Sequence, residues 1–314
     1  MRYALATLAL IALAAAATIY GAFRADMANA RQRIAAGSSV FSTSFGAVEY
    51  AIRGEGPPVL LLHGAGGGYD QGLLLGRIAL PDGYRQIAVS RFGYLRSPVP
   101  ADGSTEAQAA AYVSLLDHLN VDRVIVVAGS GGGPSALQFA HDFPQRTSAL
   151  ILVSAVSKLM PPGEQDASQL AVIHAVQRSD FLFWLASQAF QGQFLGLLGV
   201  PPDVYAQLTP EEQSLAHEML DMMHPITLRR VGSFREGEQV PPDAAQLGQI
   251  RAPTLILHAR DDSLVVPAHA EHAHGSIPHS RLVLYDSGGH GLLAQVGSVR
   301  AHVHEFLNGV DVGR

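Results

Sequence analysis

The stretch RVIVVAGSGGGPSALQFA, residues 123–140, decides how the rest of the chain is interpreted. Its first half is a continuous apolar run, which is typical of a strand buried on both faces of a parallel sheet. A helix-like pattern resumes after Pro134, and between the two halves four glycines surround Ser130. A glycine-rich turn from strand to helix either cradles a phosphate with its backbone N–H groups or exposes one hydroxyl as a nucleophile.

The phosphate-binding interpretation fits this turn poorly. A P-loop places a lysine directly after its last glycine, and the turn contains no lysine. A dinucleotide fingerprint, Gly-x-Gly-x-x-Gly, needs glycine where this chain has Pro134, and it follows the first strand of its domain. The turn here follows the fourth or fifth strand-like run, so the sequence favours a nucleophile at Ser130.

The residues around Ser130 have the sizes that a nucleophile turn requires. A strand that turns at once into a helix needs small residues two positions before and two after the nucleophile, and these are Ala128 and Gly132. The motif is therefore Ala-x-Ser-x-Gly, which departs from the usual Gly-x-Ser-x-Gly by one methyl group. The same turn places the N–H of Gly131 at a helix N-terminus, where it can stabilise an oxyanion.

A general base and an acid are expected further along the chain, because a serine hydroxyl is a weak nucleophile until its proton is removed. Asp261 and Asp262 follow the apolar run at 254–259, and His290 lies in a glycine-rich loop after the run at 282–285. The carboxyl ends of parallel strands meet at one edge of the sheet. We predict that His290 is the base and Asp262 the acid, with Asp261 as the alternative acid or as a cap for the following turn.

The second oxyanion donor is expected in the loop after an earlier apolar run. The sequence LLLHGAGGG, residues 60–68, provides the N–H of Ala65, with that of Gly66 as the alternative. His63 in the same loop is expected to orient it rather than to carry a proton.

In this order and spacing, the motifs HGAGGG, SRFGYLRSP, AGSGGG, ARDDSLVVP and GGHG resemble those of the α/β-hydrolase superfamily, in the branch with a helical lid inserted after the sixth strand. The resemblance covers about residues 44–308. It implies an α/β-hydrolase fold with a mostly parallel central sheet, helices on both faces and a helical cap insertion. It also implies a triad of Ser130, His290 and Asp262, with Ala65 and Gly131 forming the oxyanion hole.

The chain is expected to contain five segments. Residues 1–23 form a hydrophobic signal anchor and residues 24–40 a tether. Residues 41–156 and 251–314 form the two parts of the hydrolase core, and residues 157–250 form the helical cap. Within the cap, the aromatic and leucine-rich stretch that begins at Phe181 is either a lipid-docking surface or a helix that faces the core, and we expect the latter.

The N-terminal segment predicts attachment to a membrane. Residues 3–23 carry no charge, and about 20 such residues can span a bilayer. This run is longer than the usual ~7–15-residue apolar core of a cleaved signal peptide. We predict one membrane-anchoring helix with the catalytic domain outside the cytoplasm. Secretion after cleavage near Ala28-Asn29-Ala30 is the alternative.

Composition excludes several other classes. The net charge of −6 argues against a nucleic-acid partner. The absence of cysteine excludes thiol nucleophiles, disulfides and cysteine-ligated metal sites. No metal or organic cofactor is required by the expected chemistry, and the sequence makes no prediction of oligomeric state.

These observations predict a serine hydrolase that cleaves a small-molecule carboxylic ester or related acyl substrate through an acyl-enzyme. The same triad could serve an aminopeptidase, a carbon–carbon bond hydrolase or a perhydrolase. A noncatalytic, membrane-tethered binding module is the alternative from a different class.

Overall fold

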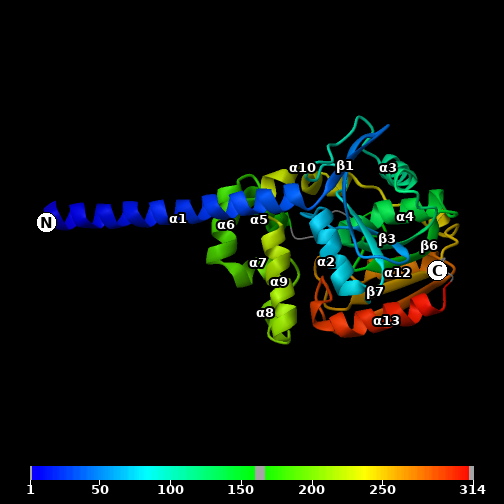
Figure 1. The fold of residues 1–314 in the computed structure, drawn as a ribbon. Helices are drawn as coiled ribbons and strands as arrows, with labels where there is room; N and C mark the ends of the chain where they lie inside the picture. Colours follow the sequence, from blue (N-terminus) through cyan, green and yellow to red (C-terminus); the bar gives the residue numbers. More distant parts are fainter. Residues whose placement is uncertain (1, 160–166, 311–314) are drawn as a thin grey trace.

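A single sheet runs through the centre of the molecule (Figure 1). The structure, a computed structural model, describes residues 2–159 and 167–310. Within these residues the sheet has eight strands, which are β1 Ser39–Thr43, β2 Gly46–Arg53, β3 Pro58–Leu62, β4 Arg85–Val89, β5 Val124–Gly129, β6 Thr147–Val153, β7 Thr254–Ala259 and β8 Ser280–Tyr285. Their order is β1-β2-β4-β3-β5-β6-β7-β8. Strands β3 to β8 are parallel to one another, whereas β1 and β2 pair antiparallel at one edge. The expected mostly parallel sheet is confirmed.

Helices cover both faces of this sheet, which explains why its central strands are apolar along their whole length. Every residue of β6 and β7 is buried. One buried hydrophobic cluster joins one face of the sheet to α3, α4 and α12, and a second joins the opposite face to α2 and α13. The bounds of these helices are α2 Tyr69–Ala79, α3 Thr105–His118, α4 Gly133–Asp142, α12 Ala268–Ser276 and α13 Val296–Asn308.

A helical segment is inserted between β6 and β7, and we refer to it as the cap. Its helices are α5 Ala167–Val176, α6 Asp180–Ala189, α7 Gln191–Leu197, α8 Pro202–Tyr205, α9 Pro210–Met222, α10 Arg230–Phe234 and α11 Ala244–Leu247, with short 3₁₀ turns η2 Ile226–Leu228 and η3 Glu236–Glu238. A third hydrophobic cluster joins the cap to α2 and to the start of α13. The cap therefore rests on the core next to the carboxyl ends of the strands.

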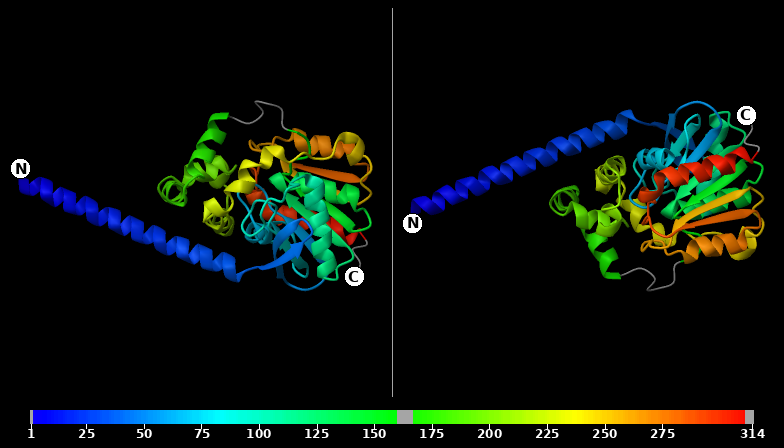
Figure 2. Two further views of the ribbon diagram at one scale, coloured as in Figure 1. Left: turned by 90° about the horizontal axis from the view of Figure 1, so that it is seen from above. Right: turned by 90° about the horizontal axis from the view of Figure 1, so that it is seen from below.

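The chain begins with one helix, α1, which spans Arg2–Ala36 and extends away from the rest of the molecule in all views (Figures 1 and 2). Among the described residues, α1 is the helix whose length and composition would allow it to cross a membrane; a signal sequence would pass the same test.

Two features near the N-terminus add detail to the expected organisation. Residues 24–36, which the sequence describes as a tether, are helical and continue α1, and Met27, Ala30 and Ile34 on this part are buried. Strand β1 then begins at Ser39, two residues before the start at residue 41 that we predict for the hydrolase core.

Candidate active site

Ser130 occupies the turn between β5 and α4 with a strained backbone. Its φ of +51° lies in the left-handed region that residues with a side chain rarely adopt. Such a conformation costs on the order of 1–3 kcal/mol and persists only where its surroundings impose it. Here the Val156 N–H donates to the carbonyl oxygen of Ser130 at 3.0 Å, and a 3₁₀ turn, η1 Ser130–Gly132, leads directly into α4.

The glycines after Ser130 allow the start of α4 to lie against two strand ends. A Cβ on Gly132 would lie 2.6 Å from the Leu62 carbonyl oxygen, and a Cβ on Gly133 would collide with the Val156 carbonyl oxygen. Ala128, which stands where glycine is usual, has its methyl group fully buried in the cluster beside α3 and α4. The glycines thus meet the steric needs of the turn.

Asp262 and His290 come together at the ends of β7 and β8. Asp262 Oδ2 lies 2.9 Å from His290 Nδ1. Its Oδ1 accepts hydrogen bonds from the N–H groups of Leu264 and Val265 at 2.9 and 3.0 Å, and its side chain is fully buried. The carboxylate is therefore held in a fixed orientation against one ring nitrogen of His290.

The electrostatic environment keeps Asp262 ionised. Burial raises the pKa of this carboxyl, but the charge of His290 and hydrogen bonds from two histidines and a backbone N–H outweigh it. The net result holds the pKa of Asp262 well below its usual range. The second histidine is His258, whose Nε2 lies 3.3 Å from the same Oδ2 and 2.7 Å from the Val265 carbonyl oxygen.

Asp261 has a different set of partners. Its two carboxylate oxygens accept the N–H groups of Gly288 and Gly289, at 3.1 and 2.9 Å. Both glycines have positive φ and directly precede His290. Asp261 therefore shapes the loop that carries His290, whereas Asp262 contacts the imidazole itself.

One contact between the cap and the His290 loop is made by backbone atoms. The His290 N–H donates to the Gly199 carbonyl oxygen at 2.9 Å. Gly199 has a φ of +82°, and a Cβ there would collide with the Cβ of His290. Only glycine allows the cap backbone to approach the loop this closely.

Ser130 and His290 line the same cavity, which has a volume of about 440 Å³ and lies between the core and the cap. No hydrogen bond joins Ser130 Oγ to the imidazole in this structure, although both residues are among those described; such bonds are often long before substrate binds. Most of the surrounding side chains are apolar. They include Leu74, Ile78, Leu198, Met219, Met223 and Phe234.

The loop after β3 lies directly beside Ser130. A Cβ on Gly64 would be 2.8 Å from the Ser130 Cβ and 3.3 Å from its Oγ, so the backbone passes close to the hydroxyl. Ala65, the next residue, lines the cavity. The alternative donor, Gly66, gives its N–H to Ser233 Oγ of the cap at 3.0 Å, which leaves Ala65 as the better placed donor.

His63 is bonded through both ring nitrogens. Its Nε2 accepts the Arg91 N–H at 3.0 Å, so Nδ1 carries the proton and donates to the Gly64 carbonyl oxygen at 2.7 Å. Burial and the nearby Arg91 cation hold the pKa of His63 well below its usual range. A neutral histidine with both nitrogens engaged orients the loop and is not available as a base.

A polar cluster beside Ser130 was not expected from the sequence. Glu236 of the cap pairs with Arg91 and accepts a hydrogen bond from the Tyr94 hydroxyl, and Arg91 also donates to the Gly131 carbonyl oxygen at 2.8 Å. Arg91 and Tyr94 belong to the motif SRFGYLRSP, which marked the region as important without revealing a partner more than 130 residues away.

The histidine-rich segment at 269–274 does not gather ligands for a metal. His269 is fully buried, and its Nδ1 accepts the Ser157 N–H at 3.2 Å. Glu271 and His274 of the same segment are exposed. Among the described residues, no three His, Asp or Glu side chains are grouped as a metal site.

Comparisons with known proteins agree with this architecture. A family model described as alpha/beta hydrolase fold matches residues 57–295. The chain is 30% identical to the uncharacterized hydrolase YcgS of Bacillus subtilis, over 84% of this chain and 94% of that protein. It is 28% identical to 2-hydroxy-6-oxo-6-phenylhexa-2,4-dienoate hydrolase of Comamonas testosteroni, over 77% and 84% of the two chains.

Solved structures show the same likeness. An alpha/beta hydrolase fold protein from Nakamurella multipartita superposes with a TM-score of 0.71 at 29% identity, over 86% of this chain and 99% of that one. Naproxen esterase from Bacillus subtilis has a TM-score of 0.65 at 20% identity, over 86% and 91% of the two chains. At that identity the esterase likeness concerns the fold alone.

Proposed function

This chain belongs to the alpha/beta hydrolase family, and on that premise we propose that it is a serine hydrolase that cleaves neutral carboxylic esters. The observation that carries the proposal is the geometry at the edge of the sheet. Ser130, on its strained turn, shares one cavity with His290, and the imidazole is fixed by the buried carboxylate of Asp262.

In the proposed mechanism, His290 uses Nδ1–H to bond Asp262, which leaves the lone pair on Nε2 to accept the Ser130 proton. The Ser130 oxygen attacks the ester carbonyl carbon, and the N–H groups of Ala65 and Gly131 stabilise the oxyanion. The alcohol leaves with the proton from His290. Water, activated by the same imidazole, then hydrolyses the acyl-enzyme and frees the acid.

The charge of the cavity supports a neutral substrate. Among the described residues that line it, Glu236 is an acid and none is lysine or arginine. A carboxylate on the substrate would therefore enter a largely apolar site without a cation at its wall, and burying an unpaired charge is costly. An uncharged acyl group gains from burial against the leucine and methionine side chains.

The test is hydrolysis of p-nitrophenyl acetate and butyrate by the full chain and by Ser130→Ala. We expect hydrolysis by the native protein and loss of it in the variant, together with loss of covalent labelling by a fluorophosphonate. Ser154→Ala is a matched control, because Ser154 lines the same cavity, also has a positive φ of +47° and lies at the end of β6. It is expected to keep the fluorophosphonate label. Equal rates for native protein and Ser130→Ala would contradict the proposal and favour a binding module.

Carbon–carbon bond hydrolysis is the second candidate, because the relative from Comamonas testosteroni is named as a hydrolase of a hexadienoate. That substrate carries a carboxylate. Turnover of such a dienoate faster than of p-nitrophenyl butyrate would favour this alternative over ester hydrolysis.

We also propose that α1 is an uncleaved membrane anchor, with the catalytic domain outside the cytoplasm. Cleavage after Ala30 would remove Met27, which is buried against the folded domain, and would expose its contact surface. The mass of the membrane-extracted protein tests this: a chain that begins near residue 31 would instead support secretion after signal cleavage.

A further inference from the structure

We propose that cap helix α6 lies in the interfacial layer of the bilayer that α1 spans, so that the cap itself contacts lipid. The proposal rests on α1 being a membrane anchor, and it does not depend on the reaction that the site catalyses.

The first observation is where α1 leaves the folded domain. Its side chains are exposed from Arg2 to Ala22, and Phe23 is the first that is partly buried. The uncharged run also ends at Phe23, and Arg24 follows it. The part of α1 that extends beyond the body in Figure 1 is thus the part that could cross the bilayer, and the body begins at the level of the interface.

The second observation is that the start of α6 contacts α1 at this level. The ring of Phe23 lies 5.2 Å from that of Phe181 and 5.7 Å from that of Trp184, measured between centroids. The Trp184 indole N–H donates to Asp26 Oδ2 at 2.8 Å. Trp184 is buried, so these contacts fix the start of α6 against α1 at the level where the uncharged run of α1 ends.

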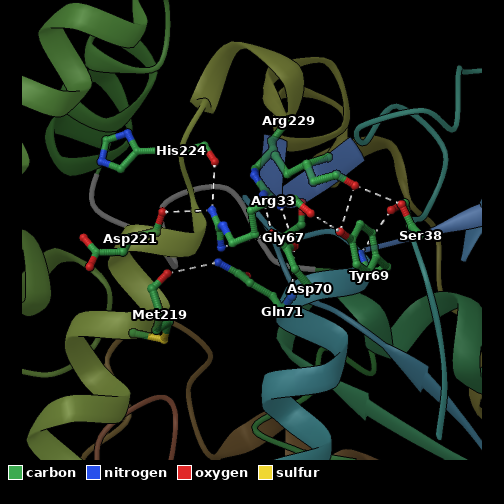
Figure 3. A network of polar contacts seen from close by, with 12 residues as sticks. Arg33, Ser38, Gly67, Tyr69, Asp70, Gln71, Met219, Asp221, His224 and Arg229 are labelled. Carbon is green, nitrogen blue, oxygen red and sulfur yellow. Dashed lines mark hydrogen bonds and ion pairs between the residues drawn. The ribbon is translucent and has the colours of Figure 1, made fainter. Parts of the chain in front are cut away.

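The third observation is that α1 is fixed to the cap and the core at its other end (Figure 3). Arg33 donates to the carbonyl oxygens of His224 at 3.3 Å and Asp221 at 3.5 Å, and its guanidinium lies 3.8 Å from Asp70. The Tyr69 hydroxyl of α2 donates to the Ile34 carbonyl oxygen at 3.0 Å. The docked part of α1, residues 23–34, is therefore held at both of its ends. The direction of α1 then determines which face of the cap is turned to the bilayer.

The fourth observation is an apolar stripe on α6. Leu182 and Leu185 are exposed by 52% and 38%, and their spacing places them, with the exposed Ala189, along one side of α6. Phe190, which is 58% exposed, directly follows the last residue of the helix. The only charged residue of α6, Asp180, is paired with Arg31 at 3.2 Å. Single exposed apolar residues are common, but a stripe that continues from a membrane helix marks an interaction surface.

The experiment uses single-cysteine labelling, which is direct because the chain has no native cysteine. The full chain with Leu185→Cys carries an environment-sensitive NBD label and is reconstituted into nanodiscs of phosphatidylcholine and phosphatidylglycerol. Quenching by brominated acyl chains then reports contact with lipid. Leu10→Cys is the positive control on α1, and Val40→Cys, 44% exposed on β1 in the core, is the control matched in exposure.

We expect quenching at Leu185 to be at least about twofold larger than at Val40, with a blue-shifted emission. Adding Leu182→Glu and Phe190→Glu should reduce it toward the Val40 level. Quenching at Leu185 that equals that at Val40, or that is unchanged by the two glutamates, would overturn the proposal. Absence of quenching at Leu10 would overturn it through its premise. Placing every label in a Ser130→Ala background should leave the pattern unchanged, which separates this result from the test of hydrolysis.

Discussion

Two neighbouring carboxylates provide the sharpest test of the proposed site, because the same isosteric change can be made at each. Asp262→Asn and Asp261→Asn both replace one carboxylate oxygen by an amide NH₂ group, at adjacent positions after β7. In the structure, however, Asp262 contacts the imidazole of His290, and Asp261 contacts the backbone of the loop before it.

For Asp262→Asn the expected loss is large. The two N–H groups of Leu264 and Val265 hold Oδ1 as an acceptor, so the new amide NH₂ takes the position of Oδ2 and faces His290 Nδ1. That donor stabilises the tautomer with the proton on Nε2, which cannot accept the proton of Ser130. In a triad this lowers kcat by about 10⁴-fold, equivalent to about 5 kcal/mol of transition-state stabilisation.

For Asp261→Asn the expected loss is small. The amide oxygen keeps one of the two backbone N–H bonds, and one charge-assisted bond, worth about 1.5–3 kcal/mol when buried, is lost. Because Asp261 is solvent-exposed, water compensates for much of this, and we expect kcat to fall by less than about tenfold.

The assay is kcat for p-nitrophenyl butyrate, with the rate of fluorophosphonate labelling of Ser130 as a second readout. Circular dichroism and thermal unfolding of each variant check that both are folded. Equal losses at the two positions, or an Asp262→Asn enzyme that keeps more than about a tenth of its activity, would refute the assigned roles.

Three further outcomes are expected. Gly133→Ala should lower the free energy of unfolding by about 1–3 kcal/mol or prevent folding, because its Cβ collides with the backbone of Val156 in the loop after β6. Gly192→Ala, which has open space on α7, should be neutral or stabilising, and thermal unfolding compares the two variants. Arg229→Met should lower the free energy of unfolding, measured by denaturant titration, by about 3–5 kcal/mol, because it leaves the buried carboxylate of Asp70 without its bidentate partner. A decrease of less than about 1 kcal/mol would contradict this. Because the pKa of Asp262 is lower in the folded state, its ionised carboxylate stabilises the fold above the unfolded-state pKa near 3.8. This contribution is lost as the pH falls below that value. Between about pH 5 and 2, the free energy of unfolding should therefore decline more steeply for the native chain than for Asp262→Asn.

The parts of the molecule that could be predicted from sequence are those set by local sterics and by strand order. The turn at Ser130 can be recognised in the sequence because a side chain at Gly132 or Gly133 would collide with the backbone at or just after the end of a neighbouring strand, so glycine is required there. His290 and Asp262 are readable because parallel strands bring their carboxyl ends to one edge.

The features that the sequence left unassigned depend on partners that are distant in the chain. Glu236 pairs with Arg91 across 145 residues, and neither residue has a local pattern that identifies the other. The docking of α1 on the cap is similar. Residues 24–36 are polar and rich in alanine, and their partners in the folded structure, which include Trp184 and Asp180 of the cap and Tyr69 of α2, are far away in the sequence.

The bond from the His290 N–H to the Gly199 carbonyl oxygen has a consequence for protein engineering. Caps are attractive units to exchange between related hydrolases, since they carry much of the substrate-facing surface. In this chain a grafted cap would also have to supply a glycine with positive φ beneath His290, and a carbonyl oxygen aimed at its backbone. A chimera that lacks them would have a new cavity lining, but His290 would be displaced. Its lower rate would then be attributed wrongly to poor substrate binding.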